Sequence, residues 1–251
     1  MAEVRLIPCL SDNYAVLLHE GDQTILVDAP EAAPINAVLA NEGWSLTSIL
    51  ITHHHPDHVQ AIAGVKGGAT VYGPKAEAHR IDGLDTLLED GETIHLGDVR
   101  VDCIETPGHT KNPLSFHLPD QAIAFTADTL FAMGCGRLFE GDPATMWASF
   151  VKLRARLPDE TKIYCGHEYT LTNARFAHQA LPDDAAIGAR LKAVEEARAA
   201  AEPTVPTTMA AEKATNPFMR ADDPSLARAL GLEGAGPAEV FAKLRAGRDT
   251  F

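Results

Sequence analysis

The chain has 251 residues and a mass of 26.9 kDa, which is enough for one large core or for a core with a small second domain. Its 35 acidic and 21 basic residues give a formal net charge of −14, and this mean field repels nucleic acids and anionic membrane surfaces. We therefore expect no nucleic-acid or membrane partner, and an anionic substrate would need a local basic patch.

The N-terminal segment carries an acid at Glu3 and reaches a polar turn before any long apolar run, so it does not resemble a secretory signal or a transit peptide. No stretch approaches the roughly 20 apolar residues of a membrane span. The cysteines are scattered without a CxxC pair, at Cys9, Cys103, Cys135 and Cys165. This pattern favours buried thiols in a reducing cytosol over a disulfide framework. The sequence predicts a cytoplasmic protein, and we expect a monomer.

Short β-rich runs separated by turns fill the first two thirds of the chain. Strands are predicted at 4–10, 14–20, 24–30, 47–52 and 69–73, and helices at 34–42 and 58–65. A hairpin is predicted over 92–110, followed by a pair of strands at 114–118 and 122–128.

Residues 141–158 carry the strongest helix signals. Asp142 stands at the N-cap, Pro143 at the first helical position, and apolar residues share one face. A strand at 161–168 follows, and from about residue 170 the chain becomes alanine-rich and helical. The sequence thus predicts a mixed α/β domain over 1–169 and a helical domain over 170–251.

The histidines and acids that suggest chemistry all follow predicted strands, where a rigid scaffold presents functional loops. Neutral imidazoles and carboxylates are ligands for zinc, iron and manganese alike. The candidates are His53, His55, Asp57 and His58 after "ILIT", His109 after "CIETPG", Asp128 after "AIAFTA" and His167 after "KIYCG".

The stretch "THHHPDH" crowds several imidazoles and a carboxylate together, which is hard to explain without a shared cation. In extended chain His53 and His55 point the same way and His54 points elsewhere. Asp57 and His58, at the start of the next helix, could serve a second ion. A lone histidine is more often a surface or core residue, and this is the interpretation for His19, His54, His79, His95, His117 and His178. Cys165, two residues before His167, is expected to be a small buried hydrophobe.

The motifs "THHHPDH", "TPGHT", "TADTLF" and "GHEYT" resemble, in this order, those of the metallo-β-lactamase superfamily. With "SDNY", "GCGRLFEG" and "NPFMR" the chain is more narrowly similar to the glyoxalase II branch, the hydroxyacylglutathione hydrolases. The resemblance implies an α/β fold, an αββα sandwich with a C-terminal helical domain, and two divalent metal ions. Zinc is the expected metal, with iron or manganese as alternatives. The resemblance assigns three histidines to the first ion, namely His53, His55 and His109. It assigns Asp57, His58 and His167 to the second ion, and Asp128 to both.

The resemblance also implies a glutathione site that includes Arg137, Tyr169, Arg245 and Arg248. Independently, glutathione carries two carboxylates, and arginine suits bidentate contact with them. The alternative for the C-terminal arginines is that cations simply favour the end of a helix. Two departures from the family stand out. Phe139 replaces a frequent tyrosine, and "GHTKNPLS" replaces the usual "GHTxGH".

By this resemblance the substrate is S-D-lactoylglutathione, hydrolysed to D-lactate and glutathione, a step in methylglyoxal detoxification. In the hypothesis, water shared by both ions has its pKa lowered from about 15.7 toward neutrality, attacks the thioester carbonyl as hydroxide and is oriented by Asp57. The alternatives are a glutathione persulfide dioxygenase with a single iron, a hydrolase of β-lactams, lactones or RNA on the same fold, and a metal-binding module without activity. The complete set of candidate ligands for a second ion argues against the dioxygenase.

Overall fold

The computed structural model describes residues 2–251, so the first residue of the predicted α/β domain lies outside the described part. These residues form two compact units. Unit 1 holds the chain up to Glu105 together with Asn112–Thr126, and unit 2 holds Thr106–Lys111 and Ala127–Phe251. The domain boundary that the sequence predicts after residue 169 differs from the division into these two units, and it stays a prediction.

Unit 1 contains a six-stranded sheet whose strand order follows the sequence. Its first three strands pair antiparallel, and each later strand pairs parallel with the one before it. The strands are β1 (Glu3–Cys9), β2 (Asn13–Glu20), β3 (Gln23–Val27), β4 (Ser48–Leu50), β5 (Thr70–Pro74) and β6 (Thr86–Leu88).

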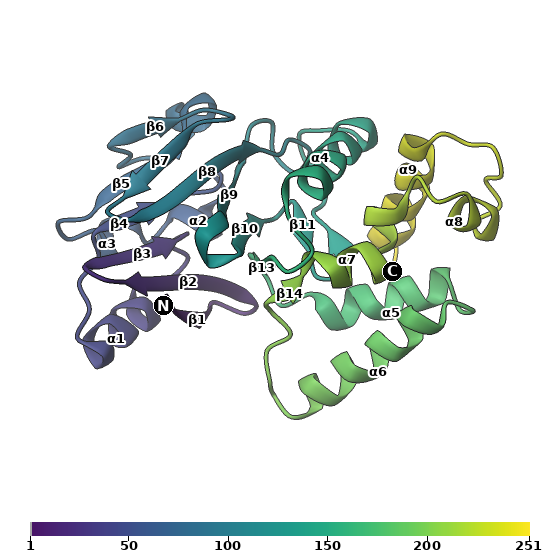
Figure 1. The fold of residues 1–251 in the computed structure, drawn as a ribbon, viewed down its shortest axis with the longest axis horizontal. Helices are drawn as coiled ribbons and strands as arrows, with labels where there is room; N and C mark the ends of the chain where they lie inside the picture. Colours follow the sequence, from purple (N-terminus) through teal and green to yellow (C-terminus); the bar gives the residue numbers. More distant parts are fainter. Residues whose placement is uncertain (1) are drawn as a thin grey trace. The chain divides into compact units, whose positions relative to one another are not determined.

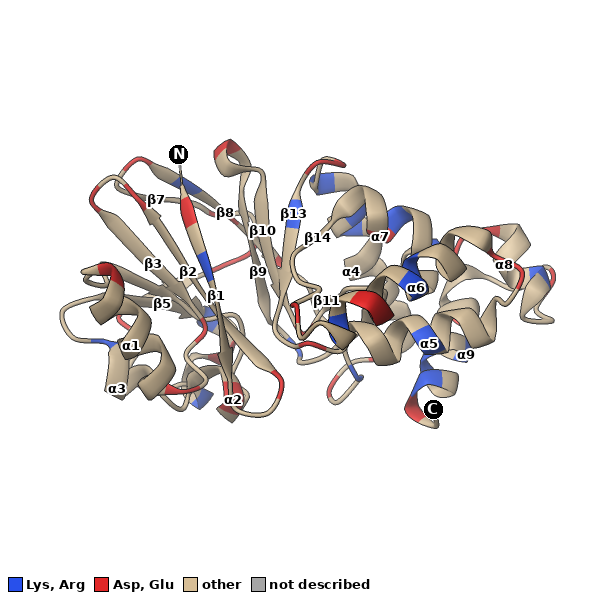
Figure 2. Cartoon of the chain, turned by 90° about the horizontal axis from the view of Figure 1, so that it is seen from below, with Lys and Arg blue, Asp and Glu red and all other residues tan. Residues whose placement is uncertain are grey.

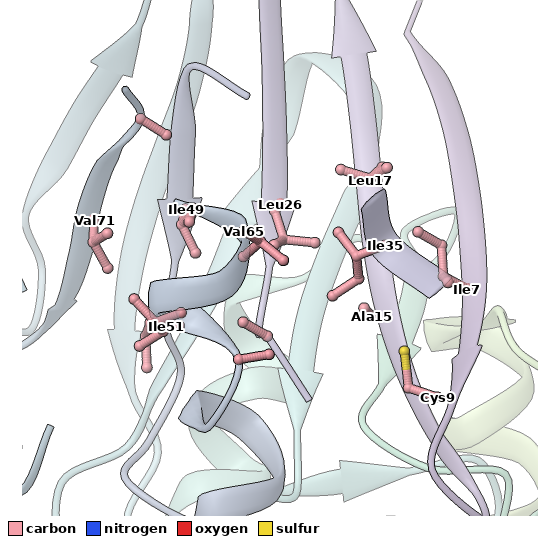
Figure 3. Packing of buried hydrophobic residues seen from close by; sticks show 14 of the residues in the cluster. Ile7, Cys9, Ala15, Leu17, Leu26, Ile35, Ile49, Ile51, Val65 and Val71 are labelled. Atoms are coloured by element: carbon pink, nitrogen blue, oxygen red, sulfur yellow. The ribbon is translucent and has the colours of Figure 1, made fainter. Parts of the chain in front are cut away.

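Short helices cover one face of this sheet (Figure 3). Leu26 and Ile49 on the strands pack in one apolar cluster with Ile35 of α1 and Val65 of α3. The cluster is fully buried or nearly so, and it fixes where the loops after β3 and β4 begin. The helices are α1 (Ala32–Glu42), α2 (Pro56–Val59), α3 (Ile62–Val65) and the 3-10 turn η1 (Lys75–Arg80).

The other face of the sheet is apolar as well, because Leu18, Ile25 and Leu50 are fully buried on it. An antiparallel sheet of the same unit lies on this side, away from α1 and α3 (Figure 2). Its strands are β7 (Thr93–Leu96), β8 (Val99–Glu105), β9 (Leu114–Leu118) and β10 (Ile123–Ala127), with the 3-10 turn η2 (Pro119–Gln121) before β10.

Unit 2 is mainly helical and has a core of aromatic side chains. The Phe218 and Phe241 rings lie 5.2 Å apart edge to face, and Phe150 contacts Phe241 at 5.4 Å. Two short strand pairs, β11 with β12 and β13 with β14, complete the unit. Its elements (Figure 1) are β11 (Leu130–Phe131), β12 (Gly134–Cys135), α4 (Pro143–Arg156), β13 (Lys162–Cys165), α5 (Thr170–Ala180), α6 (Ala185–Ala199), β14 (Thr207–Thr208), α7 (Met209–Thr215), η3 (Pro217–Arg220), α8 (Pro224–Ala229) and α9 (Pro237–Asp249).

Most predicted elements are confirmed within a few residues at their ends. Gly43 ends α1 with a left-handed φ of 69°, and the Asp142 carboxylate caps α4 by accepting the Thr145 N–H. The prediction of a single helix over 58–65 is wrong, because α2 and α3 are separate helices. The His58 carbonyl accepts a hydrogen bond from the Ala29 N–H, and the Ala61 N–H donates to the Ala29 carbonyl, so neither group continues a helix. Strand β6 was not predicted. Among residues 2–251 no helix is both long and apolar enough to cross a bilayer.

Candidate functional site

Unit 1 presents its candidate ligands on one segment, His53 to His58, which we call the histidine loop. The loop follows β4 and runs into α2. His53 and His58 are almost fully buried, at 0% and 1% exposure, whereas Asp57 is partly exposed. The loop therefore holds imidazoles inside the unit and one carboxylate near solvent.

Asp28 organises the histidine loop from the end of β3, where it adopts a left-handed φ of 55°. Its Oδ1 accepts the Thr52 backbone N–H at 2.9 Å, and its Oδ2 accepts the Thr52 hydroxyl at 2.8 Å. Oδ2 also accepts a hydrogen bond from His58 Nδ1 at 2.8 Å. One buried carboxylate thus fixes the start of the loop and its last imidazole.

These bonds determine which imidazole nitrogens keep a lone pair. Because the Thr52 hydroxyl gives its proton to Asp28, it accepts from His53 Nδ1, 3.0 Å away. The Nε2 atom of His53 then carries a lone pair and lies 3.1 Å from His55 Nδ1, a spacing that needs a proton or a metal ion between the two. Nε2 of His58 likewise keeps its lone pair, because Nδ1 donates to Asp28.

Asn13 holds the carboxylate of Asp57 through a hydrogen bond from its side-chain amide. Asn13 Nδ2 donates to Asp57 Oδ2 at 2.9 Å and to the Asp57 carbonyl at 3.3 Å. Asp57 Oδ2 in turn lies 3.7 Å from His58 Nε2. Asn13 belongs to the "SDNY" motif, so this motif acts by orienting Asp57.

His54 directs its Nδ1 into a separate buried pair with Glu77, while its ring lies edge to face with that of His55 at 4.8 Å. Glu77 Oε2 accepts the His54 backbone N–H at 3.0 Å and lies 2.7 Å from the ring Nδ1. Glu77 Oε1 accepts the Asn112 N–H at 3.1 Å. The expectation that His54 points elsewhere is confirmed, and Glu77 anchors the middle of the histidine loop.

Unit 2 brings His109, Asp128 and His167 together, and we call them the triad. His109 Nε2 lies 3.3 Å and His167 Nε2 3.4 Å from Asp128 Oδ2. His109 Nδ1 donates to the Arg137 carbonyl at 2.8 Å, because a carbonyl oxygen can only accept. The remaining nitrogen of a neutral His109 therefore directs a lone pair at a carboxylate oxygen.

Backbone contacts within unit 2 explain this convergence. The Gly166 N–H donates to the Ala127 carbonyl at 3.1 Å, which joins the residue before His167 to the residue before Asp128. A Cβ at Gly136 would lie 1.8 Å from the Asp128 carbonyl oxygen, so only glycine allows this close approach. Gly108 has a φ of 144° and touches Met146, so the turn before His109 also needs a glycine.

The chemistry of these donors fits divalent cations. Lone pairs that face carboxylate oxygens repel one another unless a cation lies between them, and neutral imidazoles with carboxylates are the ligands that zinc, iron and manganese accept. Imidazoles whose other nitrogen donates to a carboxylate or carbonyl are typical of metal sites. The His and Asp groups of this chain therefore support the binding of divalent metal ions.

Three arginines gather in unit 2 around one acid, Asp249. Arg245 is 6% exposed and donates to the Cys135 carbonyl at 2.8 Å and to Asp249 at 2.9 Å. Arg248 donates to Asn173 Oδ1 at 3.0 Å, and its pKa is lowered by burial and by the neighbouring Arg245. Arg137 lies 3.5 Å from Asp249. The cluster carries more positive than negative charge.

Aromatic rings flank the triad within unit 2. The Tyr169 ring stacks on His167, with centroids 4.7 Å apart and planes 4° apart. Phe139 is 59% exposed and meets the His109 ring edge to face at 5.3 Å. The Arg137 guanidinium lies 5.9 Å from the Phe139 ring. Cys165 is buried, which confirms the expectation of a small buried hydrophobe, and burial raises the pKa of its thiol to about 12.

Sequence reasoning missed Asp28, Asn13 and Glu77. For Asp28 a signal existed, because "VDAP" places a carboxylate directly after a buried strand, as in the candidates that were chosen. Asn13 stood in a motif that was used only for resemblance. Glu77 lies in a 3-10 turn with no pattern of its own.

The comparisons with known proteins agree over the whole length. The family model "Metallo-beta-lactamase superfamily" matches residues 10–167, and "Hydroxyacylglutathione hydrolase C-terminus" matches residues 168–251. A protein named hydroxyacylglutathione hydrolase from Ruegeria pomeroyi is 50% identical, covering 99% of each chain. One of the same name from Mesorhizobium japonicum has the same identity and coverage. The chain belongs to the hydroxyacylglutathione hydrolase family. Members of this family are metal-dependent thioester hydrolases.

Solved structures show that the chain has the metallo-β-lactamase fold. The structure titled ETHE1 from Myxococcus xanthus has a TM-score of 0.65 at 23% identity and covers 99% of both chains. The BLEG-1 B3 metallo-beta-lactamase has a TM-score of 0.68 at 22% identity, covering 86% of this chain and 99% of that one. At these identities the likeness concerns the fold alone, and it confirms the predicted fold class with its helical C-terminal region.

Proposed function

We propose that this protein hydrolyses S-2-hydroxyacylglutathione thioesters, S-D-lactoylglutathione among them, to a hydroxy acid and glutathione. The observation that carries the proposal is full-length identity of about 50% to proteins named hydroxyacylglutathione hydrolase. The orientation of the candidate ligands within each unit supports it. A persulfide dioxygenase or another hydrolase of the same fold is not favoured by these relatives.

We further propose that the histidine loop and the triad serve the same pair of metal ions. His53, His55 and His109 would hold one, Asp57, His58 and His167 the other, and Asp128 both. The chain passes between the units after Glu105, Lys111 and Thr126. His109 and Asp128 are therefore each within three residues of a covalent link to unit 1. Zinc is the proposed metal because imidazole and carboxylate ligands suit it, and iron or manganese would serve equally well by the same criterion.

When bound, such ions lower the pKa of a shared water toward neutrality and polarise the thioester carbonyl. Asp57, held by Asn13, accepts a hydrogen bond from the attacking water and orients it toward the carbonyl carbon. The water oxygen, having lost a proton to solvent, would bond to the carbonyl carbon, and the carbon–sulfur bond would then break. The thiol formed has a pKa of about 8.5, so glutathione leaves as a thiolate without a dedicated acid, and the hydroxy acid is released as its carboxylate.

The arginine cluster of unit 2 would bind the carboxylates of glutathione. Arg137 is the most exposed of the three at 61% of its side chain, and Arg248 is half-buried and held by Asn173. Arg245 donates its hydrogen bonds to the Cys135 carbonyl and to Asp249, so it would contribute positive charge to the site rather than direct contacts with glutathione. Tyr169 would close the site beside His167, and Phe139 would offer an apolar ring where a hydroxyl is absent.

We also propose that the enzyme works as a cytoplasmic monomer. All of the cysteines are free and buried, and burial raises the pKa of Cys103 and Cys165 to about 12. Free thiols suit a reducing compartment. Sedimentation of the metal-loaded protein at several concentrations tests the oligomeric state, and a dimer that persists at nanomolar concentration would refute this part.

The function is tested by purifying the protein, determining its metal by mass spectrometry and following three substrates in parallel. S-D-lactoylglutathione should be hydrolysed, whereas a β-lactam and a glutathione persulfide should not turn over at a comparable rate. Bound metal without thioesterase activity would contradict the proposal and would indicate a metal-binding module instead.

A further inference from the structure

The "NPFMR" motif has no role in the chemistry proposed above, yet its first residue is fully buried against the chain that leads out of the triad. Asn216 is 0% exposed. Its side-chain amide donates to the Phe131 carbonyl at 3.3 Å and to the Gly134 carbonyl at 3.0 Å. These two carbonyls belong to β11 and β12, which pair at this position. One amide therefore bridges both strands of a tight hairpin.

Glu212 holds the same hairpin at its tip. Its Oε2 accepts the Met133 N–H at 2.8 Å and the Asn216 amide at 2.9 Å. Met133 has a left-handed φ of 59°, a conformation that is unfavourable for a residue with a side chain. The Glu212 carboxylate, 0% exposed, is itself held by Arg190 and Thr207. The bend of the hairpin is thus fixed by a buried charge rather than by a glycine.

The hairpin starts just after Asp128 and ends just before the residues that touch His109. Past its second strand, the Gly136 N–H donates to the Thr129 carbonyl at 3.2 Å, and Gly136 packs against the Asp128 carbonyl. The next carbonyl, that of Arg137, accepts the His109 Nδ1 proton at 2.8 Å. The position of this acceptor therefore depends on how the hairpin folds back.

We propose that Glu212 and Asn216 are positioning residues for the metal centre. By fixing the hairpin, they hold the Arg137 carbonyl where it takes the Nδ1 proton of His109, and His109 then presents Nε2 to the metal. The proposal rests on the proposed function insofar as His109 is a metal ligand. The "NPFMR" motif thereby has a role in orienting the metal ligand His109, and this role is separate from glutathione binding.

The test uses Asn216→Asp, which keeps the acceptor for the Phe218 N–H but replaces the hydrogen bonds donated to Phe131, Gly134 and Glu212 with repulsion. Zinc affinity is measured by competition with a chelating dye, and metal content is followed as the free zinc is lowered. Loss of a partner that orients a ligand typically weakens metal binding by about 10- to 100-fold. We expect about a tenfold rise in Kd for the ion that His109 holds, so that one ion leaves before the other.

Arg220→Gln is the matched control, since Arg220 lies in the same motif and contacts Asp184 and the Ala214 carbonyl instead of the hairpin. It should lower the melting temperature while leaving both zinc affinities within twofold of the original. Glu212→Gln, which disturbs the hairpin from its other anchor, should behave like Asn216→Asp. If Asn216→Asp does not fold, Glu212→Gln replaces it in both measurements.

A second readout is independent of metal and of activity. In the metal-free protein, nitrogen NMR of the imidazoles should show a slowly exchanging Nδ1 proton on His109, which becomes exposed to exchange in Asn216→Asp and Glu212→Gln but not in Arg220→Gln. Unchanged zinc affinity and an unchanged His109 proton in both variants would overturn the proposal. If the original protein binds none of zinc, iron and manganese, the proposed function fails, and the NMR comparison still decides whether the hairpin positions His109.

Discussion

Asp28 and His58 are thirty positions apart in the sequence, and the carboxylate of the one accepts the Nδ1 proton of the other at 2.8 Å. Asp28 lies past the end of β3, and the histidine loop begins past the end of β4, its parallel neighbour. Because parallel neighbours end at the same edge of a sheet, the carboxylate reaches both Thr52, just before the loop, and His58, its last imidazole. This contact fixes the tautomer of His58.

Asp28→Asn should weaken metal binding by about 10- to 100-fold and lower kcat, because an amide cannot accept the proton of His58 as a carboxylate does. Chelator competition on the purified variant measures the loss. Asp85→Asn is the control: Asp85 accepts the Val71 N–H and pairs with Lys66 in the same unit, and its loss should leave metal affinity unchanged. Equal affinities for Asp28→Asn and the original protein would remove Asp28 from this role.

Asp128→Ala should release both metal ions, because one carboxylate serves both in the proposed centre. Metal content after dialysis at micromolar free zinc is the measurement. Asp142→Ala, which removes the N-cap of α4 at a cost of about 1 kcal/mol, controls for simple destabilisation of unit 2 and should retain its metal. A full complement of metal with normal turnover in Asp128→Ala would show that the assignment is wrong.

Arg248→Ala should raise KM by about tenfold with little change in kcat, because a group that binds glutathione carboxylates stabilises substrate and transition state alike. Steady-state kinetics with S-D-lactoylglutathione separates the two constants. Arg175→Ala removes an arginine that pairs with Glu195 on α6 and should change neither. If KM for Arg248→Ala stays at the original value, Arg248 does not belong to the glutathione site.

Asp184 links stability to pH through its ion pair with Arg220, at 2.7 Å. Burial alone would raise the pKa of this carboxyl, but the Arg220 hydrogen bond and the Ile187 N–H outweigh it and hold the pKa below its usual 3.8. The stabilisation is therefore complete above pH 3.8 and is lost as the pH falls through the folded-state pKa.

Asp184→Asn, which still caps α6, should lower the free energy of unfolding by about 1 kcal/mol at pH 7. Denaturant unfolding at a series of pH values measures the difference between the two proteins. The difference should begin to shrink below pH 3.8 and reach zero once the pH has fallen through the lowered folded-state pKa, where the original carboxyl is neutral as well. A difference that stays constant down to pH 2 would show that the charge is not the cause.

The histidine loop could be predicted from the sequence because its members are neighbours in the chain, and their spacing alone implies a shared cation. The positions of most strands along the chain and the cap of α4 followed from local patterns in the same way. Asp28 shares with the chosen candidates its place after a buried strand, but its role could not be assigned, because its contact with His58 exists only once β3 and β4 pair. The same holds for Glu77 and Asn13, whose partners are distant in sequence.

The break between α2 and α3 shows the same limit. The apolar spacing of residues 58–65 suits a single helix, and the break comes from Ala29, which takes up the His58 carbonyl through a backbone hydrogen bond. For Arg245 the family resemblance suggested substrate contact, and the structure adds its bonds to Cys135 and Asp249, which no local pattern contains. Tertiary contacts, rather than propensity, decide such features.

Anomalous diffraction at the zinc edge from crystals of the zinc-loaded protein tests the central claim most directly. The account predicts two zinc peaks per chain, one within bonding distance of His53, His55 and His109, the other of Asp57, His58 and His167, with Asp128 bonded to both. A single fully occupied peak under zinc-replete conditions, or peaks bound by other residues, would contradict it.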